Sequence, residues 1–260
     1  MIYNLSKIDP EIRTAIEASP KWRKLFSEKP KKLLAVGADA KTVKGEKLMV
    51  MTAIMYLTPA NGSGWNLCPL AELARCKEPC LNTAGRGKMQ SVAMARLRKT
   101  LYFLQYRAEF LAQLHAEIEA LRDVAEKRGM ILRIRLNGTS DIRWEIMGVP
   151  QAHPMVSFYD YTKIPNRNVP DNYDLTFSYS GAAEFQPHVQ RAIAAGLRVA
   201  VVFRTRERVE AMLANGESFM GLPIVDGDDS DNRPEDPHGS AVALYAKGDA
   251  KRDMSGFVVD

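Results

Sequence analysis

Short apolar runs alternate with polar or helical segments over the second half of the chain. Between several of these runs lies a segment of helical length, such as Pro187 to Ala195 and Arg206 to Asn215. Strands that alternate with helices predict a parallel sheet built from βαβ units, and therefore an α/β fold. The runs, each as long as a strand, begin at Ile131, Met155, Tyr173, Leu197, Leu222 and Ala241.

The first half of the chain adds one strand and a long helix to this pattern. The run KLMVMTAIMYL, from Lys47 to Leu57, is apolar and predicts a buried strand. Met89 to Arg128 contains no Gly or Pro, and its apolar residues recur at spacings of three and four, which predicts at least one long amphipathic helix. About seven strands suit a partial or open (β/α) barrel better than a complete eightfold barrel.

The N-terminal segment differs in composition from the rest of the chain. Six basic residues lie close together and are interrupted by prolines, which break any long helix. We therefore expect an irregular basic arm over residues 1–45 that packs on a barrel-like domain of residues 46–260. The basic residues are Lys21, Arg23, Lys24, Lys29, Lys31 and Lys32.

Composition limits the environment and the partners of the chain. No run approaches the roughly 20 apolar residues that cross a bilayer, and Met1 to Arg13 lacks the core of a signal peptide. We therefore expect a cytoplasmic protein without membrane contact. The formal charge of +5 is compatible with nucleic-acid binding but mostly describes an ordinary solvated surface.

All three cysteines of the chain lie in one short segment, NLCPLAELARCKEPC, as C-x7-C-x3-C. Thiolates bind soft iron or zinc, so Cys68, Cys76 and Cys80 predict either a 4Fe-4S cluster with one open iron or a zinc ion that needs a fourth ligand. Zinc motifs usually contain C-x2-C pairs or nearby histidines, and the four histidines here are scattered, which favours the cluster. The alternative without metal is three small buried side chains.

Polar residues follow several predicted strands at the point where each strand ends. Ligands of parallel α/β folds bind at the C-terminal edge of the strands, so these side chains predict one shared pocket. Lys163 and Arg204 could neutralise a carboxylate or phosphate there, or could form ordinary salt bridges. The candidate pocket residues are Asn137, Thr139, Asp141, Lys163, Ser178, Ser180, Arg204 and Asp226.

An acidic stretch begins at the last of these positions and runs from Asp226 to Asp236. Charge-rich loops are usually solvated surface, which is the favoured interpretation here. Contact with a divalent ion or substrate is the alternative, because Asp226 follows a strand end directly.

Five segments carry a resemblance to a known family. They are WNLCPLAELARCKEPCLNTAGRG, RIRLNGTSDIRW, FYDYTK, FSYS and VDGDDSDNRPEDPHGSAVALYAKG, which together run from about Trp65 to Gly248. They resemble the gene-product-88-like proteins of bacteriophages, which look like relatives of radical S-adenosylmethionine enzymes. The resemblance implies a radical-SAM-like (TIM-like) open barrel, cluster ligation by the three cysteines, and support of the cluster by Asn66 and Arg86.

The leading hypothesis is therefore a phage protein that binds one 4Fe-4S cluster, with a redox or radical-SAM-like role and an unknown small molecule or redox partner. S-adenosylmethionine is a candidate cofactor, although radical enzymes usually show C-x3-C-x2-C and this chain does not. The second hypothesis is a nucleic-acid-binding module that a zinc ion or cluster stabilises, without catalysis. A cluster that serves only as a sensor or structural staple is a third.

Overall fold

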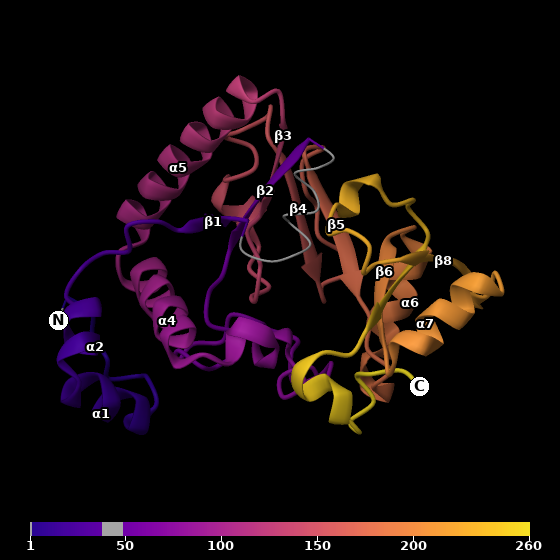
Figure 1. Ribbon diagram of the computed structural model, residues 1–260, viewed down its shortest axis with the longest axis horizontal. Coiled ribbons are helices and arrows are strands. Elements are labelled where there is room, and N and C mark those ends of the chain that lie inside the picture. The colour runs from indigo at the N-terminus through magenta and orange to yellow at the C-terminus, as the bar shows by residue number, and fades with distance from the viewer. Residues whose placement is uncertain (1, 38–48) are drawn as a thin grey trace.

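The computed structural model describes residues 2–37 and 49–260. Within these residues the strands form one sheet in the order β1-β2-β3-β4-β5-β6-β9-β8-β7 (Figure 1). All neighbours from β2 to β8 pair in parallel, whereas β1 and β7 pair antiparallel at the two edges. The sheet does not close on itself in the described part of the chain. The expected α/β class and the open, mostly parallel sheet are thus confirmed.

All seven predicted strands are present, and two more lie at the edges. The additional strands are only two and three residues long, too short to leave a recognisable pattern. The predicted start of the first strand, Lys47, lies outside the described residues. The strands are β1 Leu34–Val36, β2 Val50–Met55, β3 Ile131–Arg135, β4 Ser157–Thr162, β5 Tyr173–Ser178, β6 Arg198–Phe203, β7 Ser218–Phe219, β8 Leu222–Asp226 and β9 Ala241–Tyr245.

The helix predicted over Met89 to Arg128 is two helices, which meet at Tyr106. Tyr106 leaves the helical conformation, and its hydroxyl donates a hydrogen bond of 2.6 Å to the carbonyl of Ile2, so the N-terminal segment is bound at this bend. The other two predicted helices are confirmed to within one residue. The α-helices of the described residues are α1 Pro10–Ala18, α2 Pro20–Leu25, α4 Gln90–Gln105, α5 Arg107–Lys127, α6 Gln186–Ala194 and α7 Arg206–Ala214.

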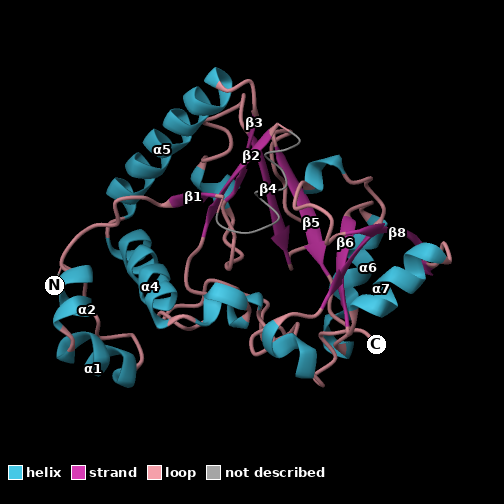
Figure 2. Ribbon diagram, viewed as in Figure 1, coloured by secondary structure: helices cyan, strands magenta, loops and turns pink. Residues whose placement is uncertain are grey.

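The helices cover one face of the sheet in two groups, as Figure 2 shows. α5 packs on β3, whereas α6 packs on β6 and α7 on β8. Two apolar clusters fill the space beneath them. Apolar residues recur every four positions in α5, and this spacing explains why the helix packs on the sheet: Phe110, Leu114 and Ile118 are fully buried on one face of it. Alternate side chains of each strand point toward the helices, and the side chains between them point toward the opposite, polar face of the sheet.

The N-terminal segment is not irregular, which corrects the expectation for residues 1–45. Pro10 and Pro20 each begin a short helix, and Asp9 and Ser19 cap the two helices. Proline suits the first turn of a helix because the missing N–H has no partner there in any case. The prolines thus separate helices instead of abolishing them. The expected boundary between residues 45 and 46 lies outside the described residues.

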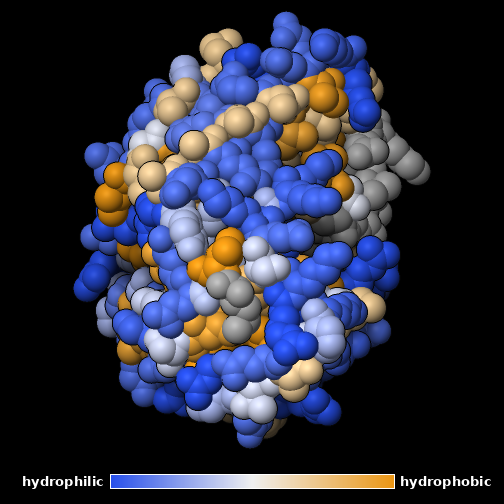
Figure 3. All heavy atoms as spheres, turned by 90° about the vertical axis from the view of Figure 1, so that its left-hand side faces the viewer, coloured by the Kyte–Doolittle hydropathy of each residue, from blue (hydrophilic) through white to orange (hydrophobic). Residues whose placement is uncertain are grey.

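The helices of this segment contribute to the core with one face only. Ile16, Trp22 and Phe26 are buried in the same apolar cluster as α4 and α5. Figure 3 shows that the side of the molecule formed by these elements is mostly hydrophilic, with apolar atoms gathered low on it, at the height of α1 and α2. The charged residues between the apolar ones therefore remain in solvent.

The acidic stretch between β8 and β9 is solvated only in part, which corrects the favoured interpretation: Asp226, Asp229 and Glu235 are exposed, whereas Asp231 is buried. It folds against the polar face of the sheet, where Asp231 accepts a hydrogen bond of 2.9 Å from the hydroxyl of Tyr159 and forms an ion pair of 3.3 Å with Arg135. Arg233, from the stretch itself, is fully buried and pairs with Asp236 at 2.9 Å. The carboxylates are retained here because they neutralise arginines that the strands place inside.

We expect Asp231→Asn to lower the free energy of unfolding by about 3 kcal/mol, because it leaves the buried guanidinium of Arg135 without its counter-charge. Urea unfolding followed by circular dichroism measures the effect. Glu210→Gln is the matched control, since it breaks the exposed pair of Arg206 and Glu210 and should change stability by no more than about 0.5 kcal/mol. If both substitutions changed the free energy of unfolding equally, the buried pair of Asp231 and Arg135 would not stabilise the fold as proposed.

Candidate functional site

The segment from Asn66 to Cys80, here called the cysteine loop, lies across the C-terminal ends of the central strands. The carbonyl of Leu67 accepts a hydrogen bond of 2.8 Å from the backbone N–H of Asp141, which follows β3. The carbonyl of Ala74 accepts one of 2.8 Å from the hydroxyl of Ser180, which follows β5. The loop is thus tied to two strand ends, at the edge where parallel α/β folds bind ligands.

Each of the three thiols is half-buried and free of disulfide bonding. Cys68 Sγ accepts a hydrogen bond of 3.3 Å from the N–H of Ala60 and lies 3.8 Å from the carbonyl oxygen of Thr139. Burial raises the pKa of Cys68 to about 12 and raises the pKa of both Cys76 and Cys80. All three are therefore thiols at neutral pH, and a metal ion would have to displace their protons on binding.

Lys163 brings a buried positive charge to the same place. Its Nζ donates three hydrogen bonds of 2.9 Å, to the carbonyl and hydroxyl of Ser178 and to the carbonyl of Tyr179. Burial lowers the pKa of Lys163, while its electrostatic interactions with all three thiols and with Asp141 oppose that shift. One ammonium group therefore interacts with all three cysteines, and it would stabilise them as thiolates.

Arg96, on α4, is a second cation at the site and was not predicted from the sequence. Its Nη1 donates a hydrogen bond of 2.8 Å to the Oδ1 of Asn82, and the guanidinium lies 5.1 Å from the ring centroid of Tyr56. It interacts electrostatically with Cys80. In the sequence, Arg96 is simply a basic residue in the first helix after the cysteines. Such residues are too common for one of them to indicate a site.

Two of the predicted pocket residues form the framework beneath the cysteine loop. Asn137 is buried, and its Oδ1 accepts hydrogen bonds from Ser140, Ile142 and Trp144, which shapes the turn after β3. Asp141 accepts from the hydroxyl of Thr162 and from the N–H of Lys163, both at 2.8 Å. Burial raises the pKa of Asp141. Both side chains are thus held by protein groups and position the loop.

The other predicted residues divide between the loop and distant places. The side chain of Asn66 accepts a hydrogen bond of 2.9 Å from the N–H of Cys68, and the hydroxyl of Thr139 donates to the carbonyl of Leu57. Three residues lie elsewhere. Arg86 is exposed, Arg204 pairs with Asp260 at 2.7 Å, and Asp226 is exposed and accepts from the N–H of Asp228.

The donor set of the cysteine loop fits a metal centre in its chemistry but is not gathered around one point. Within residues 2–37 and 49–260, no three His, Cys, Asp or Glu side chains are arranged in a geometry that could hold a metal ion. The chemistry of the donors does suit a thiolate-bound centre, because three soft ligands lie beside two cations that offset their charge. The site thus has the required composition, and the cysteine loop would have to draw its thiols together around the metal.

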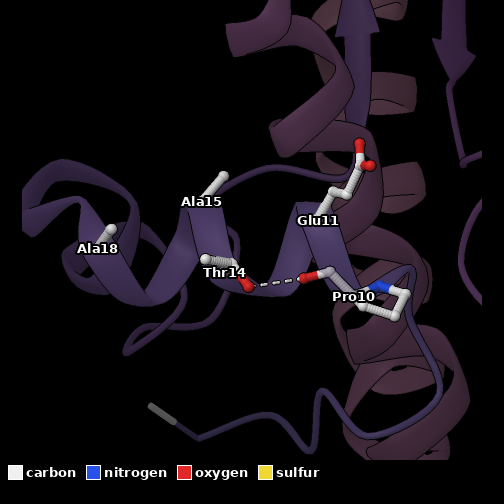
Figure 4. Close-up of a pocket in the computed structure, with 5 residues that line it drawn as sticks. All are labelled: Pro10, Glu11, Thr14, Ala15 and Ala18. Atoms are coloured by element: carbon white, nitrogen blue, oxygen red, sulfur yellow. Dashed lines mark hydrogen bonds between the residues drawn. The ribbon is translucent and has the colours of Figure 1, made fainter.

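Two hollows lie at the surface of the part of the chain that the structure describes. One lies on the outer side of α1, where the hydroxyl of Thr14 donates a hydrogen bond of 2.9 Å to the carbonyl of Pro10; Glu11 is its one charged residue (Figure 4). The other, of about 270 Å³, lies between the cysteine loop and the end of α4 and includes Asn66 and Asp141. Only the second adjoins the cysteines.

Burial raises the pKa of Asp160, beneath Asn137, to about 6. Since this folded value lies above the unfolded one, the native state binds more protons between about pH 4 and 6, and rising pH lowers stability by about 2–3 kcal/mol through this group. We expect Asp160→Asn to remove this part of the pH dependence of urea unfolding. Asp171→Asn, at an exposed position, is the control and should keep the wild-type dependence of stability on pH. If the stability of Asp160→Asn still fell with rising pH as in the wild type, the pH dependence would not come from Asp160.

Comparison with known proteins gives a family for the chain. The model of the family described as gene product 88 matches residues 25–260, which include the cysteine loop and every strand. No curated protein and no solved structure matches significantly. None of the helices in the described residues is long and apolar enough to span a membrane. The segments that carry the resemblance fall within the matched range, and the chain belongs to the gene product 88 family.

Proposed function

We propose that this phage-family protein binds one 4Fe-4S cluster through Cys68, Cys76 and Cys80. The observation that carries the proposal is the placement of all three cysteines on one loop over the C-terminal strand ends, which hydrogen bonds tie to Asp141 and Ser180 and which interacts electrostatically with the buried ammonium of Lys163. Three isolated structural cysteines would have no need of a shared cation, and a lysine is rarely fully buried without a negative partner. Three cluster thiolates would provide that partner.

The surrounding residues have separate parts in this proposal. Lys163 and Arg96 offset the negative charge of the ligands, and Asn66 orients the backbone of Cys68 through its hydrogen bond of 2.9 Å. The cluster, when bound, would supply one-electron transfer and one iron without a protein ligand. Ser178 and the carbonyl of Tyr179 hold Lys163 in place, so the cation stays fixed while the cysteine loop adjusts.

A redox or radical role extends this proposal. The open parallel sheet with cysteines over its C-terminal edge supports a radical-SAM-like arrangement, and S-adenosylmethionine is the candidate ligand of the open iron. The spacing C-x7-C-x3-C is the feature that differs from those enzymes. Formation of 5'-deoxyadenosine after reduction would support the radical role, whereas reversible reduction without that product would support electron transfer.

The protein should contain about four irons and a matching amount of sulfide per chain when it is purified without oxygen. Iron and sulfide assays, with visible and electron paramagnetic resonance spectra before and after dithionite, measure this. We expect Cys76→Ala to lose the cluster absorption, because two thiolates cannot retain a cluster that needs three.

Arg206→Gln is the matched control, since this exposed residue lies on α7 and pairs with Glu210. It should keep the full iron content. Retained absorption in Cys76→Ala would overturn the ligand assignment. One zinc per chain without sulfide would instead establish the zinc alternative.

A second candidate function is nucleic-acid binding, and one observation favours it. The six basic residues from Lys21 to Lys32 are all exposed on α2 and the turn that follows. Buried Trp22 and Phe26 anchor this element from its other side, so the charges face solvent together. Such a cluster can neutralise phosphates without reading sequence.

If this element binds nucleic acid, the affinity for a short duplex should fall about tenfold or more between 50 and 200 mM salt, because phosphate contacts release counterions. Fluorescence anisotropy with a labelled duplex measures the affinity. The triple substitution K21Q/K24Q/K29Q should abolish binding, and Lys127→Gln at the end of α5 should not. Absent or salt-insensitive binding would remove this candidate.

A further inference from the structure

The hollow beside the cysteine loop is an open surface groove with an apolar wall and a charged rim. Its volume is about 270 Å³, and its walls include Leu67, Phe103, Ile142 and Ile164. An apolar cavity of about 150 Å³ accepts a benzene ring, so this groove has room for a ring and a short polar extension. It lies at the C-terminal ends of β3 and β4, where α/β proteins bind their ligands.

Two arginines give the groove a positive rim. Arg107 stacks on Phe103, with its guanidinium carbon 3.7 Å from the ring centroid, and its Nη1 donates to the thioether sulfur of Met147 at 3.3 Å. Its Nε also donates a bond of 2.8 Å to the carbonyl of Phe103. A thioether is a weak acceptor, so the terminal nitrogens keep most of their hydrogen-bonding capacity for a stronger partner. The stacking meanwhile holds the plane of the guanidinium fixed, which favours bidentate binding of an anion.

Arg143 lies on the same rim and is also weakly engaged. Its one carboxylate contact is a bond of 3.3 Å from Nε to Glu145. That carboxylate is already occupied by Arg167, which donates to it at 3.1 and 2.6 Å. The terminal nitrogens of Arg143 thus remain for a ligand.

The one carboxylate in the lining does not compete for these arginines. Both oxygens of Asp141 accept hydrogen bonds of 2.8 Å from the end of β4, at Thr162 and Lys163. They are therefore turned toward the strands, and the charge presented to the groove comes from Arg107 and Arg143.

We propose that this groove binds a small organic acid with an apolar body, of the arylalkyl carboxylate class. The carboxylate pairs with Arg107 and Arg143, and the ring lies against the partly exposed side chains of Ile142 and Ile164. The proposal goes beyond the cluster and does not rest on it, because no cysteine is among the described lining residues. Since Leu67 directly precedes Cys68, a bound acid lies beside the cysteine loop.

Isothermal titration calorimetry of the full chain with 3-phenylpropionate tests the proposal. We expect a Kd of about 1 mM, in line with the efficiency of small ligands. The neutral 3-phenylpropionamide has the same shape without the charge and should bind at least about fivefold more weakly. Arg107→Gln and Arg143→Gln should each weaken binding of the acid about fivefold. Arg206→Gln, an exposed arginine on α7, should leave it unchanged.

The side chain of Arg143 is 46% exposed, so Arg143→Gln remains informative if Arg107→Gln lowers stability. Equal binding of the acid and the amide would overturn recognition of the charge. Unchanged binding in both arginine variants would overturn the location. No binding up to about 20 mM acid would overturn the proposal as a whole. Loss of iron has no bearing on these outcomes, so failure of the cluster and failure of the groove are distinguishable.

Discussion

Lys163 connects the end of β4 to the end of β5 and places its charge beneath the cysteine loop. Its three hydrogen bonds use the carbonyls of residues 178 and 179 and the hydroxyl of Ser178, so the ammonium is solvated by protein instead of water. Two aromatic rings, of Phe185 and Phe257, lie within 5.4 Å of it. A charge desolvated to this degree is costly unless negative groups face it. Asp141 is such a group, and the three cysteines would become so as thiolates.

The polar face of the sheet and the C-terminal edge of its strands have different roles. Across the polar face, arginines of the strands meet carboxylates supplied by the stretch between β8 and β9, such as Asp231 opposite Arg135. These pairs offset one another's charge, and they join the loop to the sheet. At the C-terminal edge, thiols lie beside cations. The groups that could hold a ligand therefore collect at the edge where the parallel strands of an α/β fold leave their loops.

The cysteine loop lies between two other parts of the chain, and this position affects what it can bind. On one side it meets the end of α4 through the groove, and on the other Cys76 packs against the C-terminal segment that contains Phe257. Figure 1 shows this yellow segment at the same end of the sheet as the loop. A metal centre bound here would be shielded from solvent on that side, whereas a small ligand could approach through the groove. The two proposals thus concern neighbouring sites that share one loop.

The sequence by itself determined the α/β class, all seven main strands and the grouping of the cysteines, because apolar periodicity and residue clustering are local signals. It also brought Lys163, Asp141 and the serines after β5 to one edge, since parallel strands end on the same side. Only the tertiary structure decided that Pro10 and Pro20 begin helices and that Asp231 of the acidic stretch lies inside. It also showed that Arg204 and Asp226 lie away from the cysteines while Arg96 lies beside them. Those outcomes depend on which distant residues meet, such as Asp231 with Arg135, and neither spacing nor composition along the chain encodes such long-range pairing.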